Sequence, residues 1–240
     1  DKPAAFTRHY NKQNYCSVPG QWQQIARAMT HYYGLVSMVD AAIGRMVEGL
    51  KQAGVYDNTL ILFTSDHGEL LGAHSLIGKD ALMCDELIRV PLCVAWPGTL
   101  TGTRSDAFVN LMDGYATLLA AAGSDEQPPP TSRDLLPLMH SGSRENFPAV
   151  TFCEHHGSMF FDTVRAVRTE RYKYVFRPND SLDEFYDLRE DPRELENRIS
   201  HLEYNGIIQE LKCRLVERMR ETGDQAAKGA AYLLEWEQRS

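Results

Sequence analysis

The first hundred residues show two patterns of apolar positions, one helical and one typical of strands. After Pro19-Gly20, apolar residues recur every three or four positions as far as Gly54, which keeps one face of a helix buried. They are Ile25, Met29, Tyr32, Val36, Val39, Ile43, Val47 and Leu50. The runs at 59–64 and 90–96 are short and continuously apolar, as in strands buried on both faces. The pattern predicts a long helix followed by two buried strands.

The segment between the two strand-like runs predicts a loop at 65–78 and a short helix at 80–87. Helix, strand, loop, helix and strand in this order are typical of a layered α/β sheet, and we expect its strands to be parallel. A further helix is predicted at 115–122, with Asp113 as its cap.

The pattern changes at 124–132, where three successive prolines disfavour both helix and strand. We place a domain boundary there, with an α/β domain at 1–125 and a smaller subdomain at 126–240. Short alternating or aromatic runs beyond it predict a small antiparallel sheet: 149–153, 163–168, 171–176 and 184–188. Helical spacing then returns from Ile208 to Met219.

Composition and charge narrow the choice of partners. The 240 residues include 25 Lys plus Arg and 33 Asp plus Glu, a net charge of −8, which argues against binding to nucleic acid or to an anionic membrane. No stretch approaches the roughly 18 consecutive apolar residues of a membrane span, and the first residues are polar rather than signal-like. The oligomeric state stays open.

The five cysteines are scattered and form no CxxC pair, which predicts free thiols and favours a reducing compartment without fixing the localisation. The segment Cys153-Glu154-His155-His156 gathers zinc-ligand types. Adjacent histidines on an extended chain point to opposite faces, however, so no zinc site is predicted there.

Candidate chemistry follows the first strand-like run, where the sequence reads Ser65-Asp66-His67-Gly68-Glu69. In open α/β sheets, ligands bind beyond the carboxyl ends of the strands. Asp66 and His67 could bind a divalent cation if the turn splays them, although Asp-His-Gly is also ordinary turn chemistry. His74 and Lys79 would add a proton donor and a cation, or would be solvated loop residues.

The segment 60–98 resembles the sulfatase family of the alkaline phosphatase superfamily. It reads LILFTSDHGELLGAHSLIGKDALMCDELIRVPLCVAWPG. The preceding helix, YYGLVSMVDAAIGRMVEGLKQAGVYDNT, and the segment 108–123 are also similar to the family. Towards the far end, Tyr186-Asp187-Leu188, Asp191-Pro192 and 194–197 resemble its YDL strand end and DPxExxN helix start. The resemblance covers roughly residues 30–200 in ordered blocks.

The resemblance implies a fold and a set of site residues. The fold would be α/β, part of an alkaline phosphatase-like layered sheet, with a smaller C-terminal α+β subdomain that contains an antiparallel sheet. Asp66 and His67 resemble metal ligands, with Ca²⁺ expected and Mg²⁺ or Mn²⁺ as alternatives. Lys79 resembles the lysine that contacts the sulfate or its leaving oxygen, and His74 a substrate contact or proton donor. Glu69 and Glu86 are expected to organise the loop, by capping or by pairing with Arg89.

One departure from the family pattern is large. Sulfatases use a Cys or Ser in a (C/S)xPxR context, converted to formylglycine, and no such segment occurs here. Cys16 lies three rather than two positions before Pro19, and Ser17-Val18-Pro19 is followed by Gln21 in place of the arginine. We therefore expect the chain to be the C-terminal portion of a metal-dependent sulfuric ester hydrolase, inactive alone, with its formylglycine upstream. Its substrate would be a small-molecule or carbohydrate sulfate ester. A phosphate monoester or phosphonate hydrolase of the same superfamily, or a noncatalytic sulfatase-like module, are the alternatives.

Overall fold

The computed structural model describes residues 2–4, 6, 21–79, 81–145, 147–157, 163–178, 180 and 182–230. The chain divides into two compact units, and each is built from separated stretches of sequence. One unit comprises Ser17–His67 and Val90–Pro148. The other comprises Asp1–Cys16, Gly68–Arg89 and Ala149–Ser240. The boundary that the sequence suggests between residues 125 and 126 stays a prediction.

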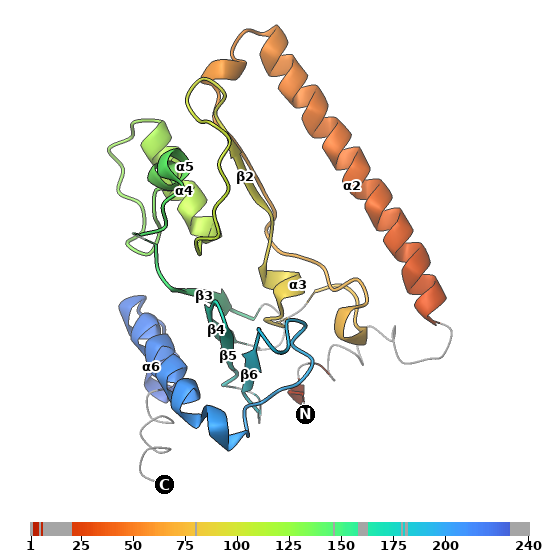
Figure 1. The fold of residues 1–240 in the computed structure, drawn as a ribbon, viewed down its shortest axis with the longest axis vertical. Helices are drawn as coiled ribbons and strands as arrows, with labels where there is room; N and C mark the ends of the chain where they lie inside the picture. Colours follow the sequence, from red (N-terminus) through yellow and green to blue (C-terminus); the bar gives the residue numbers. More distant parts are fainter. Residues whose placement is uncertain are drawn as a thin grey trace. The chain divides into compact units, whose positions relative to one another are not determined.

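The unit that contains the first strand begins with the predicted long helix, α2 (Gln21–Gln52), followed by the short η1 (Tyr56–Asn58) (Figure 1). Strands β1 (Ile61–Thr64) and β2 (Leu92–Ala95) form a two-stranded ladder. Their pairing is antiparallel, so the expectation of parallel strands is wrong. The reason is that parallel neighbours need a crossover helix, and among the described residues of 65–91 the only helix longer than one turn of 3₁₀ is the four-residue α3 (Asp85–Ile88).

Helix α2 exposes many apolar residues among the described part of the chain, although Ile25 on its predicted apolar face is buried and Met29, Ile43, Val47 and Leu50 are partly buried. Trp22, Tyr32, Tyr33, Leu35, Val36, Met38, Val39 and Met46 are all exposed, and Met46 reaches 70%. The helical periodicity that predicted α2 is therefore correct, but the described part of the chain buries the predicted face only in part, leaving Tyr32, Val36 and Val39 exposed.

Helix α4 (Leu111–Ala121) begins earlier than predicted and uses a different cap. Asn110 is the N-cap residue, and Asp113 is the third residue of the helix, where its carboxylate accepts a bond from the Asn110 N–H at 2.7 Å. The same carboxylate accepts the Arg133 N–H at 2.8 Å. Asp113 thus ties the helix start to the segment before α5 (Leu136–Ser141), a short helix that the sequence did not suggest.

The other unit contains the predicted antiparallel sheet, with strands in the order β3 (Val150–His155), β4 (Val164–Thr169), β5 (Tyr172–Phe176) and β6 (Glu184–Asp187). All neighbouring strands pair antiparallel. Helix α6 (Asn205–Glu221) follows the short η3 (Leu202–Tyr204) and lies against the sheet (Figure 1). The predicted α+β subdomain is confirmed.

Alternation along the strands gives the sheet two apolar faces. Val167, Tyr174 and Phe185 pack with Leu211 and Leu215 of α6 on one face. Ala166 and Val175 point to the other face, where they meet residues 81–88. Side chains of successive strand residues point to opposite faces, so both faces of this small sheet are covered.

The segment 81–84 is extended, which corrects the helix predicted at 80–87. Ala81 and Met83 pack on the sheet, whereas Leu82 and Cys84 pack in a second core with Leu70. A helix would place these four residues on several faces, while an extended chain sends them alternately into two cores. Only α3 remains helical here. No helix among the described residues is long and apolar enough to cross a membrane.

Candidate functional site

Asp66 and His67 lie directly after β1, at its carboxyl end. The Asp66 side chain is 84% exposed, and its Oδ2 lies 3.4 Å from His67 Nε2. The turn is held locally, because the His67 N–H donates to Asp66 Oδ1 at 3.0 Å and the Ser65 hydroxyl donates to the His67 carbonyl at 2.8 Å. The turn therefore presents a carboxylate and an imidazole side by side.

Gly68 is required by close backbone approach. Its N–H donates to the Leu87 carbonyl at 2.8 Å, and a Cβ at this position would lie 1.9 Å from the Glu86 carbonyl oxygen. No side chain fits in that space. The glycine after His67 thus lets the start of the loop lie directly against the backbone of α3.

Glu69 organises the loop that follows, as the sequence suggested. Its carboxylate accepts the Gly78 N–H and, at 3.4 Å, the Leu71 N–H, so it bridges the two ends of the loop. Within the loop lies the short η2 (Ala73–Ser75). Lys79 follows the loop closure and is exposed.

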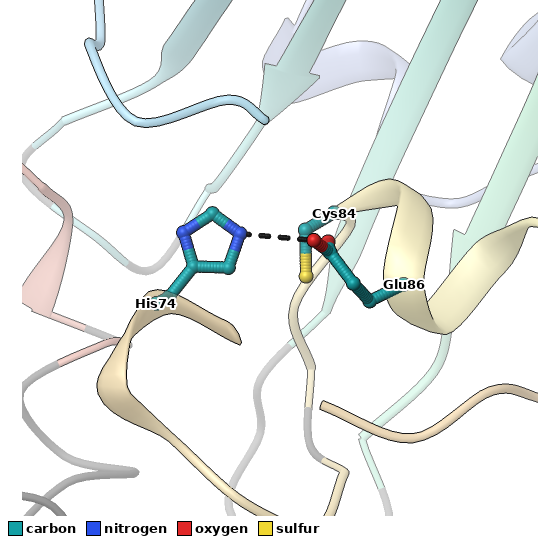
Figure 2. A group of neighbouring side chains, drawn as sticks. All are labelled: His74, Cys84 and Glu86. Carbon is teal, nitrogen blue, oxygen red and sulfur yellow. Dashed lines mark ion pairs between the residues drawn. The ribbon is translucent and has the colours of Figure 1, made fainter. Parts of the chain in front are cut away.

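His74 is turned inward rather than towards solvent. Its side chain is only 4% exposed, and its ring packs edge-on against Phe6 with centroids 5.6 Å apart. Figure 2 shows the imidazole facing the Glu86 carboxylate, with Nε2 3.5 Å from Oε2. Proximity to His74 lowers the pKa of Glu86 by favouring its charged form. The pairing of Glu86 is therefore with His74, and not with Arg89 as suggested.

Cys84 completes this cluster. The His74 nitrogen, the Cys84 Sγ and a Glu86 carboxylate oxygen all lie within 4.8 Å of one another. Burial raises the pKa of the Cys84 thiol, so the free thiol is protonated. No motif predicted the cluster, since Cys84 is an isolated cysteine ten residues from His74.

The four residues singled out from the sequence fall in both units. Asp66 and His67 end one stretch of the first unit, whereas His74 and Lys79 belong to the second. Within its own unit, the structure brings Asp66 together with His67, and His74 together with Cys84 and Glu86. The convergence of all four on one substrate stays a prediction. The described cysteines, Cys84, Cys93, Cys153 and Cys213, are free thiols, as predicted; Cys16 lies outside the described residues.

Two protein-family models match the chain and overlap in its middle. The model described as Sulfatase matches residues 2–124. The model described as N-sulphoglucosamine sulphohydrolase, C-terminal, matches residues 72–221. Together the two matches cover nearly all of the described structure.

Individual proteins are similar over most of this chain. A protein named Sulfatase from Formosa agariphila is 30% identical over 198 residues, which are 82% of this chain and 36% of that protein. A structure solved in complex with its substrate D-glucosamine-2-N,6-O-disulfate has a TM-score of 0.75 at 25% identity, covering 92% of this chain and 46% of the other. The phosphonate monoester hydrolase of Agrobacterium radiobacter has a TM-score of 0.70 at 28% identity, covering 79% and 40%. The chain thus spans less than half the length of these relatives.

Proposed function

Because the chain belongs to the sulfatase family, we propose that the whole protein hydrolyses sulfuric esters and that this chain supplies part of its metal and substrate site. The proposal rests on the position of Asp66 and His67 at the carboxyl end of β1. The exposed Lys79 follows twelve residues after His67, and both family models match the chain. The (C/S)xPxR nucleophile does not occur in these residues, so the proposal locates it elsewhere in the protein.

The donors present fit a divalent cation. Asp66 Oδ2 and His67 Nε2 are 3.4 Å apart, which is about the spacing of adjacent ligands that each lie about 2.4 Å from one Ca²⁺ ion. A hard cation takes six or more ligands, so the others would come from outside these two residues. Such an ion gathers the nonbridging oxygens of an ester and offsets their charge. Calcium is our proposal for the ion, and Mg²⁺ and Mn²⁺ fit the same donors.

Lys79 is the residue to which we assign contact with the sulfate. Its ammonium is a compact charge on a flexible stem, suited to oxygens whose charge grows as the sulfur–oxygen bond breaks. An attraction that strengthens in the transition state raises the catalytic rate more than it tightens binding. His74 fits direct substrate contact less well, because its side chain is buried against Phe6 and Glu86.

A sulfated sugar is the substrate class that we favour. The matched C-terminal model is named for N-sulphoglucosamine, and the similar structure covering most of this chain holds a disulfated glucosamine. Phosphonate monoester hydrolysis is the second candidate, supported by the likeness to the Agrobacterium enzyme. Both chemistries act on a tetrahedral oxyanion with a metal and a cation.

The test is steady-state kinetics of the full-length protein on matched nitrophenyl sulfate and phosphonate esters. Lys79→Ala should lower kcat about a hundredfold, or about 3 kcal/mol, with a smaller change in KM. Lys79→Arg should restore only part of the rate, because its planar fork is longer and directed differently. Lys51→Ala, at an exposed lysine of α2, is the matched control and should leave kcat unchanged.

The outcomes separate the alternatives. Preference for the phosphonate ester would assign the second candidate function, and turnover of neither ester by the full-length protein would support a noncatalytic module. A Lys79→Ala rate within about threefold of the unmodified protein would remove Lys79 from the site.

A further inference from the structure

A second group of metal-ligand side chains lies between the loop and α3, with His74 and Cys84 shielded from solvent and Glu86 partly exposed. His74 comes from η2, Cys84 from the residue before α3, and Glu86 from α3 itself. Figure 2 shows the three side chains pointing towards one another. Their ligand atoms lie within 4.8 Å of each other.

The His74 imidazole is buried without a hydrogen bond to its Nε2 atom. The nearest charged partner, Glu86 Oε2, is 3.5 Å away, longer than the usual N–H···O distance of about 2.9 Å. Leaving a buried ring nitrogen unpaired costs about 1–3 kcal/mol. A buried nitrogen, on a side chain that is only 4% exposed, aimed at a thiol and a carboxylate is therefore best explained by a ligand between them.

We propose that His74, Cys84 and Glu86 bind a zinc ion. Two ligands that each lie about 2.1 Å from a tetrahedral ion are about 3.4 Å apart, which matches the 3.5 Å between His74 Nε2 and Glu86 Oε2. Cys84 Sγ, within 4.8 Å of both, needs only a small side-chain movement to join them. A water molecule would take the fourth position.

The donor set also selects the ion. One imidazole, one thiolate and one carboxylate suit the borderline character of Zn²⁺ and are a poor match for Ca²⁺ or Mg²⁺, which prefer oxygen. On binding, the Cys84 thiol releases its proton to solvent, and the thiolate and the Glu86 carboxylate together balance the two charges of the ion. A neutral assembly is what the surrounding apolar core, which includes Leu70, Leu76 and Leu82, can accommodate.

The proposed zinc ion would hold the loop that contains η2 against α3. Leu71, His74 and Ser75 all have positive φ angles, of 44°, 52° and 59°, an unfavourable conformation for residues other than glycine. A bond from His74 to an ion shared with Cys84 and Glu86 would hold this strained turn in place. Because Lys79 ends the same loop, the ion would act on Lys79 as a positioning element.

The experiment replaces zinc by Co²⁺ in the chelator-treated 240-residue chain and records its absorption spectrum. A thiolate ligand produces a near-ultraviolet charge-transfer band, and tetrahedral Co²⁺ produces intense visible bands. We expect both bands to saturate at one equivalent of cobalt and to disappear on addition of zinc. Cys84→Ser should abolish the charge-transfer band, whereas Cys93→Ser and Cys213→Ser, at exposed cysteines, should keep it.

Binding of zinc itself is then measured by competition with a chromogenic chelator. Glu86→Gln and His74→Gln, which preserve side-chain size, should each weaken zinc binding by more than about tenfold. Asp66→Asn should leave both cobalt bands unchanged, which separates this centre from the ion of the proposed hydrolytic site. No charge-transfer band in the unmodified chain, or a band that survives in Cys84→Ser, overturns the proposal. Neither result depends on ester hydrolysis.

Discussion

Lys173 is a fully enclosed charge of the small sheet and links it to α3. Its side chain is 0% exposed, and its Nζ lies 2.6 Å from Asp85 Oδ1 and 2.6 Å from Glu194 Oε1, while it donates to the Met83 carbonyl at 3.0 Å. Burial raises the pKa of Glu194 despite the nearby ammonium. For Asp85, burial acts in the same upward direction, but Lys173 and Arg168 outweigh it, and its pKa is lowered.

Replacing Lys173 with Met should strongly destabilise the chain, because the buried Glu194 carboxylate would lose its ion-pair partner and the part-buried Asp85 would keep only Arg168. Removing one member of a buried ion pair typically costs about 3–5 kcal/mol. Urea unfolding of the 240-residue chain measures the loss, and Lys228→Met, at an exposed lysine, is the control that should change stability by less than about 0.5 kcal/mol. Adding Glu194→Gln to Lys173→Met should recover part of the loss. A loss below about 1 kcal/mol for Lys173→Met would contradict this account.

At the residue scale, the sequence predicted the positions whose chemistry is local. Asp66 and His67 could be singled out because they are adjacent and follow an apolar run, and the turn that presents them is held by bonds among Ser65, Asp66 and His67 themselves. The inward direction of His74 was not predictable in this way. It depends on a positive φ at His74 and on contacts with Phe6 and Glu86, which are distant in sequence.

At the element scale, the hairpin of β5 and β6 carries an ion pair at its end. Asp187 closes β6 and accepts bonds from Arg171 Nη2 at 2.7 Å, from Arg171 Nε at 3.1 Å and from the Arg189 N–H at 3.1 Å. These bonds, with that of Arg171 first, hold the pKa of Asp187 below its ordinary value. The Asp187 carboxylate thus joins Arg171, just before β5, to the turn that follows β6.

Asp187→Asn should therefore lower the thermal midpoint in a pH-dependent way. A carboxylate whose pKa is depressed by folding stabilises the protein above its unfolded pKa of about 3.9, and this contribution is lost as the pH falls through the folded value. We expect the variant to melt roughly 3 °C lower at pH 7. The difference should shrink steadily below about pH 4. Calorimetry at several pH values measures it, and a gap that stays constant down to about pH 2 would contradict the assignment.

The strands of the small sheet were predictable because their residues alternate between the two faces of the sheet. The four strands alternate between residues that meet α6 and residues that meet 81–88, and a period of two is readable in sequence. The direction of β2 relative to β1 could not be predicted, because an apolar run has the same pattern in either orientation. Only the path of residues 65–91 decides whether the two strands pair parallel or antiparallel. The helix expected at 80–87 failed because two separate cores compete for neighbouring residues.

At the scale of the whole molecule, two independent features concern the packing of α2 and the nucleophile of the proposed hydrolytic site. The middle of the apolar stripe of α2, at Tyr32, Val36 and Val39, is exposed among the described residues, and the 240-residue sequence contains no (C/S)xPxR segment. Relatives that match over most of this chain are more than twice as long as the matched part. We therefore propose that the nucleophile of the hydrolytic site, and the metal ligands beyond Asp66 and His67, lie outside these 240 residues.

The 240-residue chain alone should not hydrolyse aryl sulfates. Asp66 and His67 provide two donors where a hard cation wants six or more, and without a nucleophile the charge of Lys79 has no bond-breaking step to assist. Loss of a nucleophile alone can lower kcat by about a millionfold in a hydrolase, so turnover should lie at least about a thousandfold below that of the full-length protein. Release of nitrophenol from its sulfate ester, measured for both proteins with and without added Ca²⁺, makes the comparison. Calcium-dependent release by the 240-residue chain that Lys79→Ala abolishes would require a nucleophile among these residues.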